Sequence, residues 1–224
     1  MRYSLLLCDA DETLFDFHAG EKQALNETFT AHNLPTDEKT AALYHQINDA
    51  LWKALERHET TLEALKIDRF KQLIEALQLK TAPEAMAQTF VEKLSLQAHL
   101  MPKAEAFCEA ASQKMPIYLV TNGIAAVQRG RIKKSAIAPY ITDIIISEEV
   151  GARKPDPKML EIALKKANIA KEKAVMLGDS ITADIPAAVN AGVDSILITW
   201  GAKIESPATY SVSDLVQAQS IILA

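Results

Sequence analysis

The chain has 224 residues, of which 49% are hydrophobic, and this is enough to bury a sizeable core in one large domain or in a domain with an insertion. A net charge of −5 argues against nucleic acid as a partner, because that binding is driven by a basic surface. Two cysteines, Cys8 and Cys108, are too few for a disulfide framework or a cysteine metal cluster. No apolar run approaches membrane-spanning length and no signal pattern follows Met1, so we expect a cytoplasmic monomer or dimer with no membrane partner.

The first element is a short apolar run from Leu5 to Cys8 that ends in Asp9 and Asp11. Such a run is typical of a buried strand in a parallel sheet. Burying unpaired carboxylates is unfavourable, whereas the carboxyl end of a strand in an open α/β sheet is where ligands bind. Taken alone, the pair fits two interpretations equally well: a metal site with a nucleophile, or a turn in which Asp11 and Thr13 cap the next helix.

From residue 16 to residue 98 the apolar residues recur every three or four positions, and no strand-like stretch interrupts them. Asp37 and Pro83 are start signals for two of the helices. We therefore expect a helical cap, residues 16–98, inserted into a core made of residues 1–15 and 99–224. Trp52, Phe70 and Phe90 are candidates for stacking on a base, although aromatic residues in a helical bundle are more often core.

Beyond the helical block, strands and helices alternate, which predicts an α/β fold with a doubly wound parallel sheet covered on both faces. The expected strands are Pro116–Thr121, Asp143–Ser147, Ala174–Gly178 and Asp194–Thr199. The expected helices between them are Lys103–Lys114, Ala125–Ala136, Pro157–Asn168 and Ala183–Ala191, the last closed by Gly192 as a left-handed cap.

Polar residues stand where three of the apolar runs stop. The first run ends in Asp9 and Asp11, the second in Thr121-Asn122-Gly123, and a later one in Gly178-Asp179, with Asp184 five residues after Asp179. Between the last two lies Lys154, in a loop stiffened by Pro155 and Pro157. Each piece alone is common, and a lone loop lysine is usually solvated. The four pieces in this order are specific, and they converge if the strands are neighbours.

This order resembles the haloacid dehalogenase (HAD) superfamily of phosphotransferases over the whole chain. Two stretches, Asp9 to Phe15 and Ile146 to Gly151 followed by Lys154-Pro155, are similar to the YjjG-type pyrimidine 5′-nucleotidases. The chain departs from common family members at Glu12, where they carry glycine. In this family Asp9 to Thr13 would be the first motif and Thr121-Asn122-Gly123 the second. The resemblance implies a helical cap between these two motifs and a Mg²⁺-dependent phosphatase.

By the same resemblance, Asp9 is the nucleophile that forms an aspartyl-phosphate, and Asp11 is the general acid and then the general base. Thr13 would fix the Asp11 side chain by a hydrogen bond. Metal ligands would be Asp9, Asp179 and the backbone carbonyl of Asp11, since Mg²⁺ prefers a few oxygen ligands and keeps several waters.

The remaining motif residues would serve the phosphate and the metal. Thr121, Asn122 and Lys154 would hold or neutralise the phosphate, and Asp184 would orient a metal-bound water or Lys154. An alternative for Asp184 is a charge that favours the start of a helix, which is compatible with that role.

Several reactions share these core motifs. Dehalogenases of the superfamily lack an acid two residues after the nucleophile, so Asp11 favours phosphate ester cleavage. The resemblance to the YjjG-type enzymes implies pyrimidine nucleoside 5′-monophosphates (dUMP, dTMP and UMP) as the leading substrates. A phosphatase or phosphomutase acting on a sugar phosphate or another small phosphate monoester stays open. A phospho-acceptor signalling domain is the alternative without catalysis, but there the acid pair and the phosphorylated aspartate lie on different strands and no helical insertion follows the first one.

Overall fold

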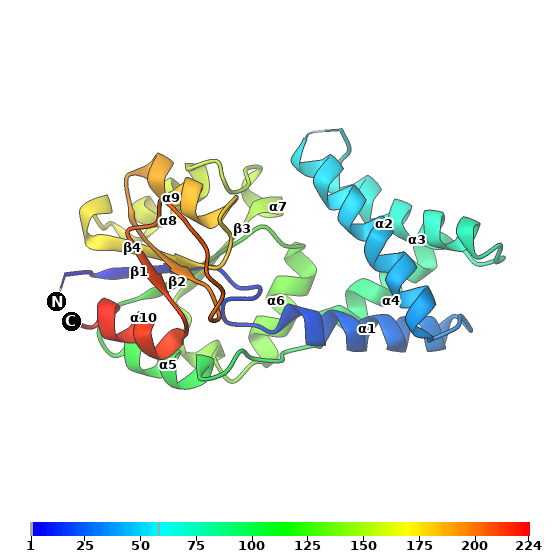
Figure 1. Cartoon of the computed structure of the whole chain (residues 1–224), viewed down its shortest axis with the longest axis horizontal. Helices are drawn as coiled ribbons and strands as arrows, with labels where there is room; N and C mark the ends of the chain where they lie inside the picture. The colour runs from blue at the N-terminus through cyan, green and yellow to red at the C-terminus, as the bar shows by residue number, and fades with distance from the viewer. Residues whose placement is uncertain (1, 58) are drawn as a thin grey trace. The chain divides into compact units, whose positions relative to one another are not determined.

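The computed structural model describes residues 2–57 and 59–224 (Figure 1). The chain forms two compact units. One contains Met1–His18 and Ala98–Ala224 and is called the core unit below; the other, Ala19–Gln97, is called the helical unit. The helical insertion was expected at residues 16–98, and the helical unit of the structure comprises residues 19–97.

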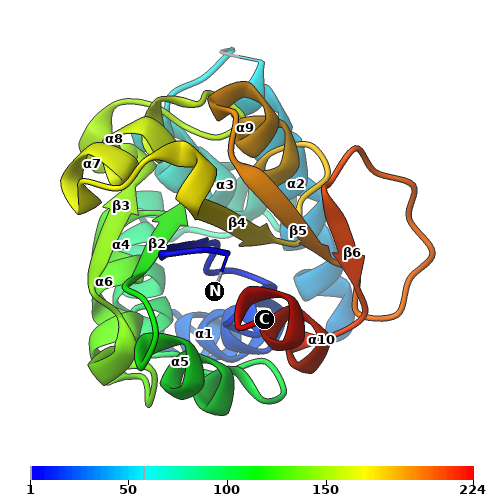
Figure 2. The same cartoon turned by 90° about the vertical axis from the view of Figure 1, so that its left-hand side faces the viewer.

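The core unit is built on a six-stranded sheet in which every neighbouring pair is parallel, in the order β3-β2-β1-β4-β5-β6 (Figure 2). The strands are Leu5–Cys8 (β1), Ile117–Thr121 (β2), Asp143–Ile146 (β3), Ala174–Gly178 (β4), Asp194–Ile198 (β5) and Tyr210–Val212 (β6). The predicted doubly wound α/β fold is therefore confirmed. β6 was not predicted, because its three residues are too few for a periodicity to show.

Helices cover both faces of the sheet, which explains why β1 is apolar throughout. Leu6 and Cys8 pack in one cluster with Phe107 and Leu215, while Leu5 and Leu7 pack in the other cluster, on the opposite face. Successive side chains of a strand point to opposite faces, and here both faces are buried.

The core unit contains six α-helices among the described residues that belong wholly to it. They are Ala104–Ser112 (α5), Ala125–Lys134 (α6), Ser147–Val150 (α7), Lys158–Ala167 (α8), Asp184–Ala191 (α9) and Leu215–Ile222 (α10), with short 3₁₀ turns at Ala138–Tyr140 (η1) and Lys171–Lys173 (η2). Gly192 ends α9 with a φ of 70°, as predicted. The helices α7 and α10 were not predicted. Because α7 begins at Ser147, β3 ends at Ile146, one residue before the predicted end of this strand.

The helical unit is a bundle whose helices are Phe17–Ala31 (α1, which begins in the core unit), Glu38–Glu56 (α2), Leu62–Ala76 (α3) and Pro83–Leu94 (α4). Asp37 caps α2 by accepting from the Thr40 amide, and Pro83 opens α4, so both start signals were correct. Phe70 and Phe90 are fully buried with ring centroids 5.5 Å apart. These two rings therefore form the core of the bundle.

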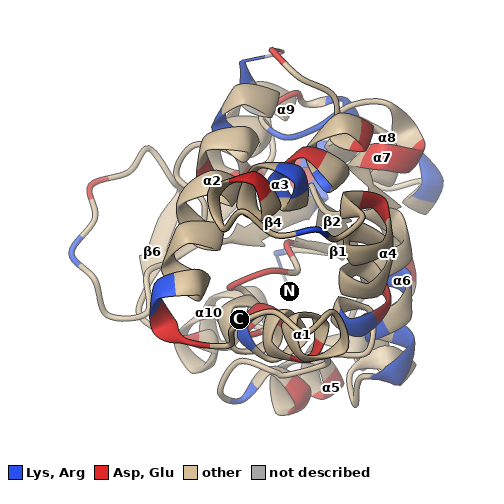
Figure 3. Ribbon diagram, turned by 90° about the vertical axis from the view of Figure 1, so that its right-hand side faces the viewer, with Lys and Arg blue, Asp and Glu red and all other residues tan. Residues whose placement is uncertain are grey.

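Charged residues of both signs lie on the helices of each unit (Figure 3). Among residues 2–57 and 59–224, no helix combines the length and the apolar character that a bilayer crossing requires.

Candidate active site

The sheet order brings the motif residues to one edge of the core unit. β1 lies between β2 and β4, with Cys8 opposite Leu119 and Leu177. Asp9 follows β1, Thr121 ends β2, and Asp179 follows β4. Because the three strands are parallel, their carboxyl ends meet at the same edge of the sheet, which is where ligands bind in such folds.

Lys154 is the centre of the cluster. Its Nζ donates to Asp9 Oδ1, to Asp184 Oδ1 and to the Val120 carbonyl, each at 2.6 Å, and the residue is only 3% exposed. Burial lowers the pKa of Lys154, but the carboxylates of Asp184 and Asp9 outweigh it and hold that pKa above its ordinary value. Lys154 is therefore a buried cation with three acceptors, and the interpretation as a solvated loop lysine is wrong.

Asp9, Asp179 and Asp184 form a cluster of acids that fits a hard divalent cation. Each offers a carboxylate oxygen, and these oxygens lie within 4.8 Å of one another. Asp184, however, uses Oδ1 on Lys154 and accepts from the Ser180 amide at 3.0 Å with Oδ2. Asp9 and Asp179 are consequently the side chains best placed to hold a cation, whereas Asp184 accepts a hydrogen bond from Lys154.

Crowding of acids in a buried place changes their proton affinity. Burial raises the pKa of the Asp9 carboxyl, and the nearby Lys154 ammonium, which acts to lower this pKa, offsets only part of the increase. Burial and the neighbouring Asp184 raise the pKa of Asp179 to about 6. Bringing these acids together is unfavourable in the absence of added positive charge, as expected for a site that takes up a cation.

Gly178 has a steric role in this cluster. A Cβ at this position would lie 2.2 Å from Asp184 Oδ2 and 2.6 Å from Asp184 Cβ. Only glycine leaves room for Asp184 to approach the end of β4 and reach Lys154.

The second motif supports the lysine loop. The Asn122 side chain donates from Nδ2 to the Lys154 carbonyl and accepts from the Lys154 amide, both at 2.9 Å. Thr121 is 1% exposed and its hydroxyl accepts from the Gly123 amide at 3.3 Å. Both ends of the Asn122 side-chain amide thus hold the backbone of Lys154, and the phosphate contact expected for Asn122 stays a prediction.

The structure also changes the expectation for Thr13 and Asp11. Thr13 donates its hydroxyl proton to Asp179 Oδ1 at 3.1 Å and does not bond Asp11 as predicted. The Asp11 carboxylate instead accepts from Gln128 Nε2 at 2.9 Å and from Arg131 Nη2, both on α6. It lies outside the cluster of acids defined above.

Sequence reasoning missed Gln128 and Arg131, although α6 carries a signal for them. Its buried residues are Val127, Gln128, Arg131 and Ile132, so two polar residues lie on the buried stripe of the helix. A buried polar side chain is expected to have a specific partner.

Glu12 occupies a left-handed backbone position with a φ of 54°, which explains why glycine suits this place in related sequences. Its carboxylate accepts from the His18 amide at 3.0 Å in the first turn of α1, and its carbonyl accepts from Trp200 Nε1 at 2.7 Å. The Glu12 side chain, which a glycine would not provide, therefore caps the start of α1.

Comparison with known proteins agrees with this geometry. Residues 3–192 match the family of haloacid dehalogenase-like hydrolases. The pyrimidine 5′-nucleotidase PynA of Streptococcus pneumoniae is 34% identical over 88% of the chain and 84% of its own length. The pyrimidine 5′-nucleotidase YjjG of Escherichia coli is 28% identical over 86% of the chain and 84% of its own length. A magnesium-bound crystal structure of the HAD-hydrolase YfnB from Bacillus subtilis superposes with a TM-score of 0.91 at 29% identity, covering all of both chains.

The chain belongs to the haloacid dehalogenase-like hydrolases. Within that family it is a phosphatase, a hydrolase of phosphoric monoesters.

Proposed function

We propose that the protein hydrolyses pyrimidine nucleoside 5′-monophosphates, with dUMP, dTMP and UMP as the leading substrates. The observation that carries this proposal is the similarity over more than four fifths of the chain to two pyrimidine 5′-nucleotidases. The stretches Asp9 to Phe15 and Ile146 to Gly151 support it.

In the first step, a carboxylate oxygen of Asp9 attacks phosphorus and the bond from phosphorus to the ester oxygen breaks. The product is an aspartyl-phosphate, and Asp11 gives its proton to the departing alkoxide. Lys154, 2.6 Å from Asp9 Oδ1, orients the nucleophile and neutralises part of the charge that builds up on the phosphoryl group. Thr121 and the amides that follow it bind phosphate oxygens.

In the second step, Asp11 takes a proton from a water molecule whose oxygen attacks phosphorus. The acyl phosphate bond breaks, inorganic phosphate leaves and the Asp9 carboxylate is restored. Asp11 thereby returns to its protonated form, so the cycle needs no other reactant than water.

The cofactor is Mg²⁺, which suits a site made of oxygen ligands alone. Asp9 and Asp179 would hold it, with the Asp11 backbone carbonyl as a further ligand. When bound, it supplies positive charge that offsets repulsion between the carboxylate nucleophile and the phosphate. Thr13 and Asp184 keep Asp179 and Lys154 in place around it.

The test is to measure kcat/KM for a panel of phosphate monoesters under the same conditions. The panel contains the 5′-monophosphates of uridine, deoxyuridine, thymidine, adenosine and guanosine, together with β-glucose 1-phosphate and phosphoserine. We expect the pyrimidine nucleotides to lead, because a site that hydrogen-bonds one base edge strongly rejects a base that leaves those groups unpaired. An Asp9→Asn preparation purified in parallel reports contaminating phosphatase. A higher kcat/KM for a purine nucleotide, the sugar phosphate or phosphoserine would reject the pyrimidine proposal and leave the phosphatase chemistry in place.

A further inference from the structure

We propose that Gln128 and Arg131, on α6, are positioning residues that hold the Asp11 carboxylate in the orientation that proton transfer requires. The proposal rests on the role of Asp11 in the proposed function, but it does not depend on which organic group the substrate carries.

The three side chains form a closed hydrogen-bonded triangle within the core unit. Gln128 Nε2 donates to Asp11 Oδ2 at 2.9 Å, and Arg131 Nη2 donates to Asp11 Oδ1. Arg131 also donates from Nε and Nη2 to Gln128 Oε1, at 3.1 and 2.8 Å. Two donors on two different oxygens fix the rotation of a carboxylate, which a single hydrogen bond does not. Each oxygen keeps a second lone pair for a proton or a water.

Arg131 is rigid in this triangle. The residue is 2% exposed, and its guanidinium carbon lies 4.7 Å from the centre of the Phe15 ring. A buried guanidinium needs hydrogen-bond acceptors for its N–H groups, and Asp11 Oδ1 and Gln128 Oε1 supply them. Asp11 itself is less covered, with a side chain 30% exposed, so it remains open to a substrate and to water.

The glycine of the second motif makes room for Gln128. A Cβ on Gly123 would lie 2.2 Å from Gln128 Nε2 and within 2.9 Å of its Cγ and Cδ. Any larger residue would therefore push the Gln128 amide away from its present place. The missing side chain at Gly123 leaves the space through which Gln128 reaches Asp11.

The stretch Ile146 to Gly151 contributes by holding α6. Glu148 accepts from the Ala125 amide at 2.6 Å in the first turn of α6, and Glu149 pairs with Arg129 through two bonds of 2.6 and 2.7 Å. These contacts come from α7, at the end of β3. This segment, one of the two that resemble the nucleotidases, thus secures the helix that carries Gln128 and Arg131.

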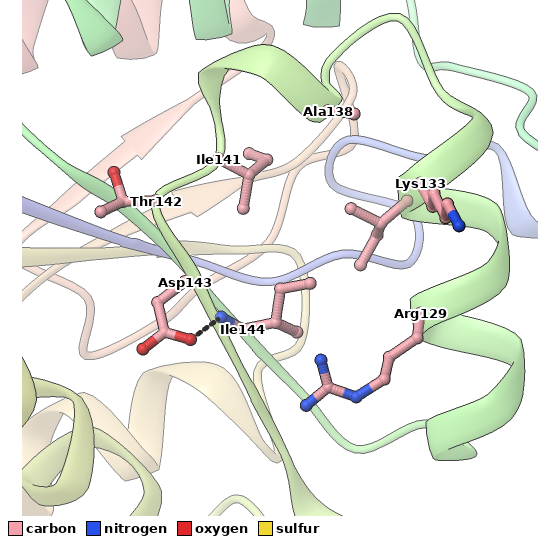
Figure 4. Close-up of a pocket in the computed structure, with 8 residues that line it drawn as sticks. Arg129, Lys133, Ala138, Ile141, Thr142, Asp143 and Ile144 are labelled. Atoms are coloured by element: carbon pink, nitrogen blue, oxygen red, sulfur yellow. Dashed lines mark hydrogen bonds between the residues drawn. The ribbon is translucent and has the colours of Figure 1, made fainter.

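The other side of α6 supplies a control. Arg129 and Lys133 line a pocket of about 430 Å³ that also includes Asp143 and Ile144 of β3 (Figure 4). None of the predicted site residues lines this pocket. Lys133 is exposed and lies two residues after Arg131, so Lys133→Ala removes a basic residue from the same helix without touching the triangle.

The experiment compares Gln128→Ala, Arg131→Lys and Lys133→Ala with the wild type on two substrates, an aryl phosphate (p-nitrophenyl phosphate) and an alkyl phosphate (a nucleoside 5′-monophosphate). Leaving-group protonation matters for the alkyl ester and much less for the aryl ester. We expect Gln128→Ala to lose roughly 10-fold to 100-fold in kcat on the alkyl ester, the scale for misplacing a catalytic group. The loss on the aryl ester should be clearly smaller, KM should change little, and Lys133→Ala should match the wild type.

The same substitution is then made in the Asp11→Asn background. If Gln128 acts through Asp11, Gln128→Ala should lower kcat only slightly in the Asp11→Asn background, because the carboxyl group that Gln128 positions is already absent. An equal loss in both backgrounds, an equal loss on both esters, or the same loss in Lys133→Ala overturns the proposal. Thermal melting of each variant identifies a folding defect, and Gln128→Ala, which removes a neutral side chain and leaves the buried charge of Arg131 in place, keeps the test decisive if Arg131→Lys does not fold. If Asp11→Asn itself keeps full activity on the alkyl ester, the acid–base role in the proposed function fails; if Asp11→Asn loses activity and Gln128→Ala does not, only the positioning role fails.

Discussion

Asp179→Asn should stabilise the protein without metal at neutral pH, because it removes a carboxylate that the fold keeps in an unfavourable place. Burial and Asp184 raise the pKa of Asp179 from 3.8 to about 6. At about 1.4 kcal/mol for each pKa unit, this corresponds to a destabilisation on the order of 3 kcal/mol once the group is ionised. Asparagine has nearly the same shape, and its oxygen can still accept the hydrogen bond of Thr13.

The difference between the folded and unfolded pKa of Asp179 determines whether the free energy of unfolding rises or falls with pH. Between pH 4 and pH 6 the folded state keeps the Asp179 proton that the unfolded state has already released, so the free energy of unfolding falls as pH rises through this range. Below about pH 4 both states are protonated and this contribution disappears. The stability gained by Asp179→Asn is therefore expected to grow from pH 4 to pH 7 and then to stay constant.

The assay is denaturant unfolding of the wild type and Asp179→Asn in EDTA at a series of pH values, with Asp49→Asn, an exposed aspartate of α2, as the matched control. Adding Mg²⁺ at pH 7 should reverse the order, because the wild type gains binding energy that the variant lacks; at 100 times the dissociation constant this gain is about 2.7 kcal/mol. A variant less stable than the wild type in EDTA at pH 7, or a stability difference that does not depend on pH, would refute the reasoning.

Further substitutions test the other parts of the site. Asp9→Asn should retain the melting temperature and lose measurable turnover. Turnover by the purified variant near the wild-type rate would contradict the proposed role of Asp9 as the nucleophile. Chelation with EDTA should abolish hydrolysis, and added Mg²⁺ should restore it; undiminished activity in excess EDTA would contradict the cation. Gly178→Ala should destabilise the fold by about 1–3 kcal/mol in denaturant unfolding, since its Cβ would meet Asp184 2.2 Å away. Glu12→Ala should be less stable than Glu12→Gly by about 1 kcal/mol, because both lose the bond to the His18 amide but only alanine is strained at a positive φ; equal stabilities would argue against that strain.

The sequence alone predicted the parallel sheet and the grouping of Asp9, Lys154 and Asp179, because these depend on periodicity and on polar residues at the ends of apolar runs. The partners of individual side chains could not be predicted in the same way. Thr13 bonds Asp179, and Gln128 reaches Asp11 across more than a hundred residues of sequence. Such contacts depend on how helices pack on the sheet and on which rotamers fit, and a pattern of residue types contains neither.

The central position of β1 has a consequence for synthesis on the ribosome. Leu5–Cys8 leaves the ribosome first, but its two neighbours, Ile117–Leu119 and Ala174–Leu177, come much later. At roughly 5–20 residues per second, the 57 positions between Ile117 and Ala174 take roughly 3–11 s to translate, and one edge of β1 stays unpaired meanwhile. During that interval Asp9 also lacks Asp179 and Asp184. A nascent chain of this protein therefore exposes an apolar strand edge until translation has passed β4, and Asp9, the proposed nucleophile, has no complete site before then.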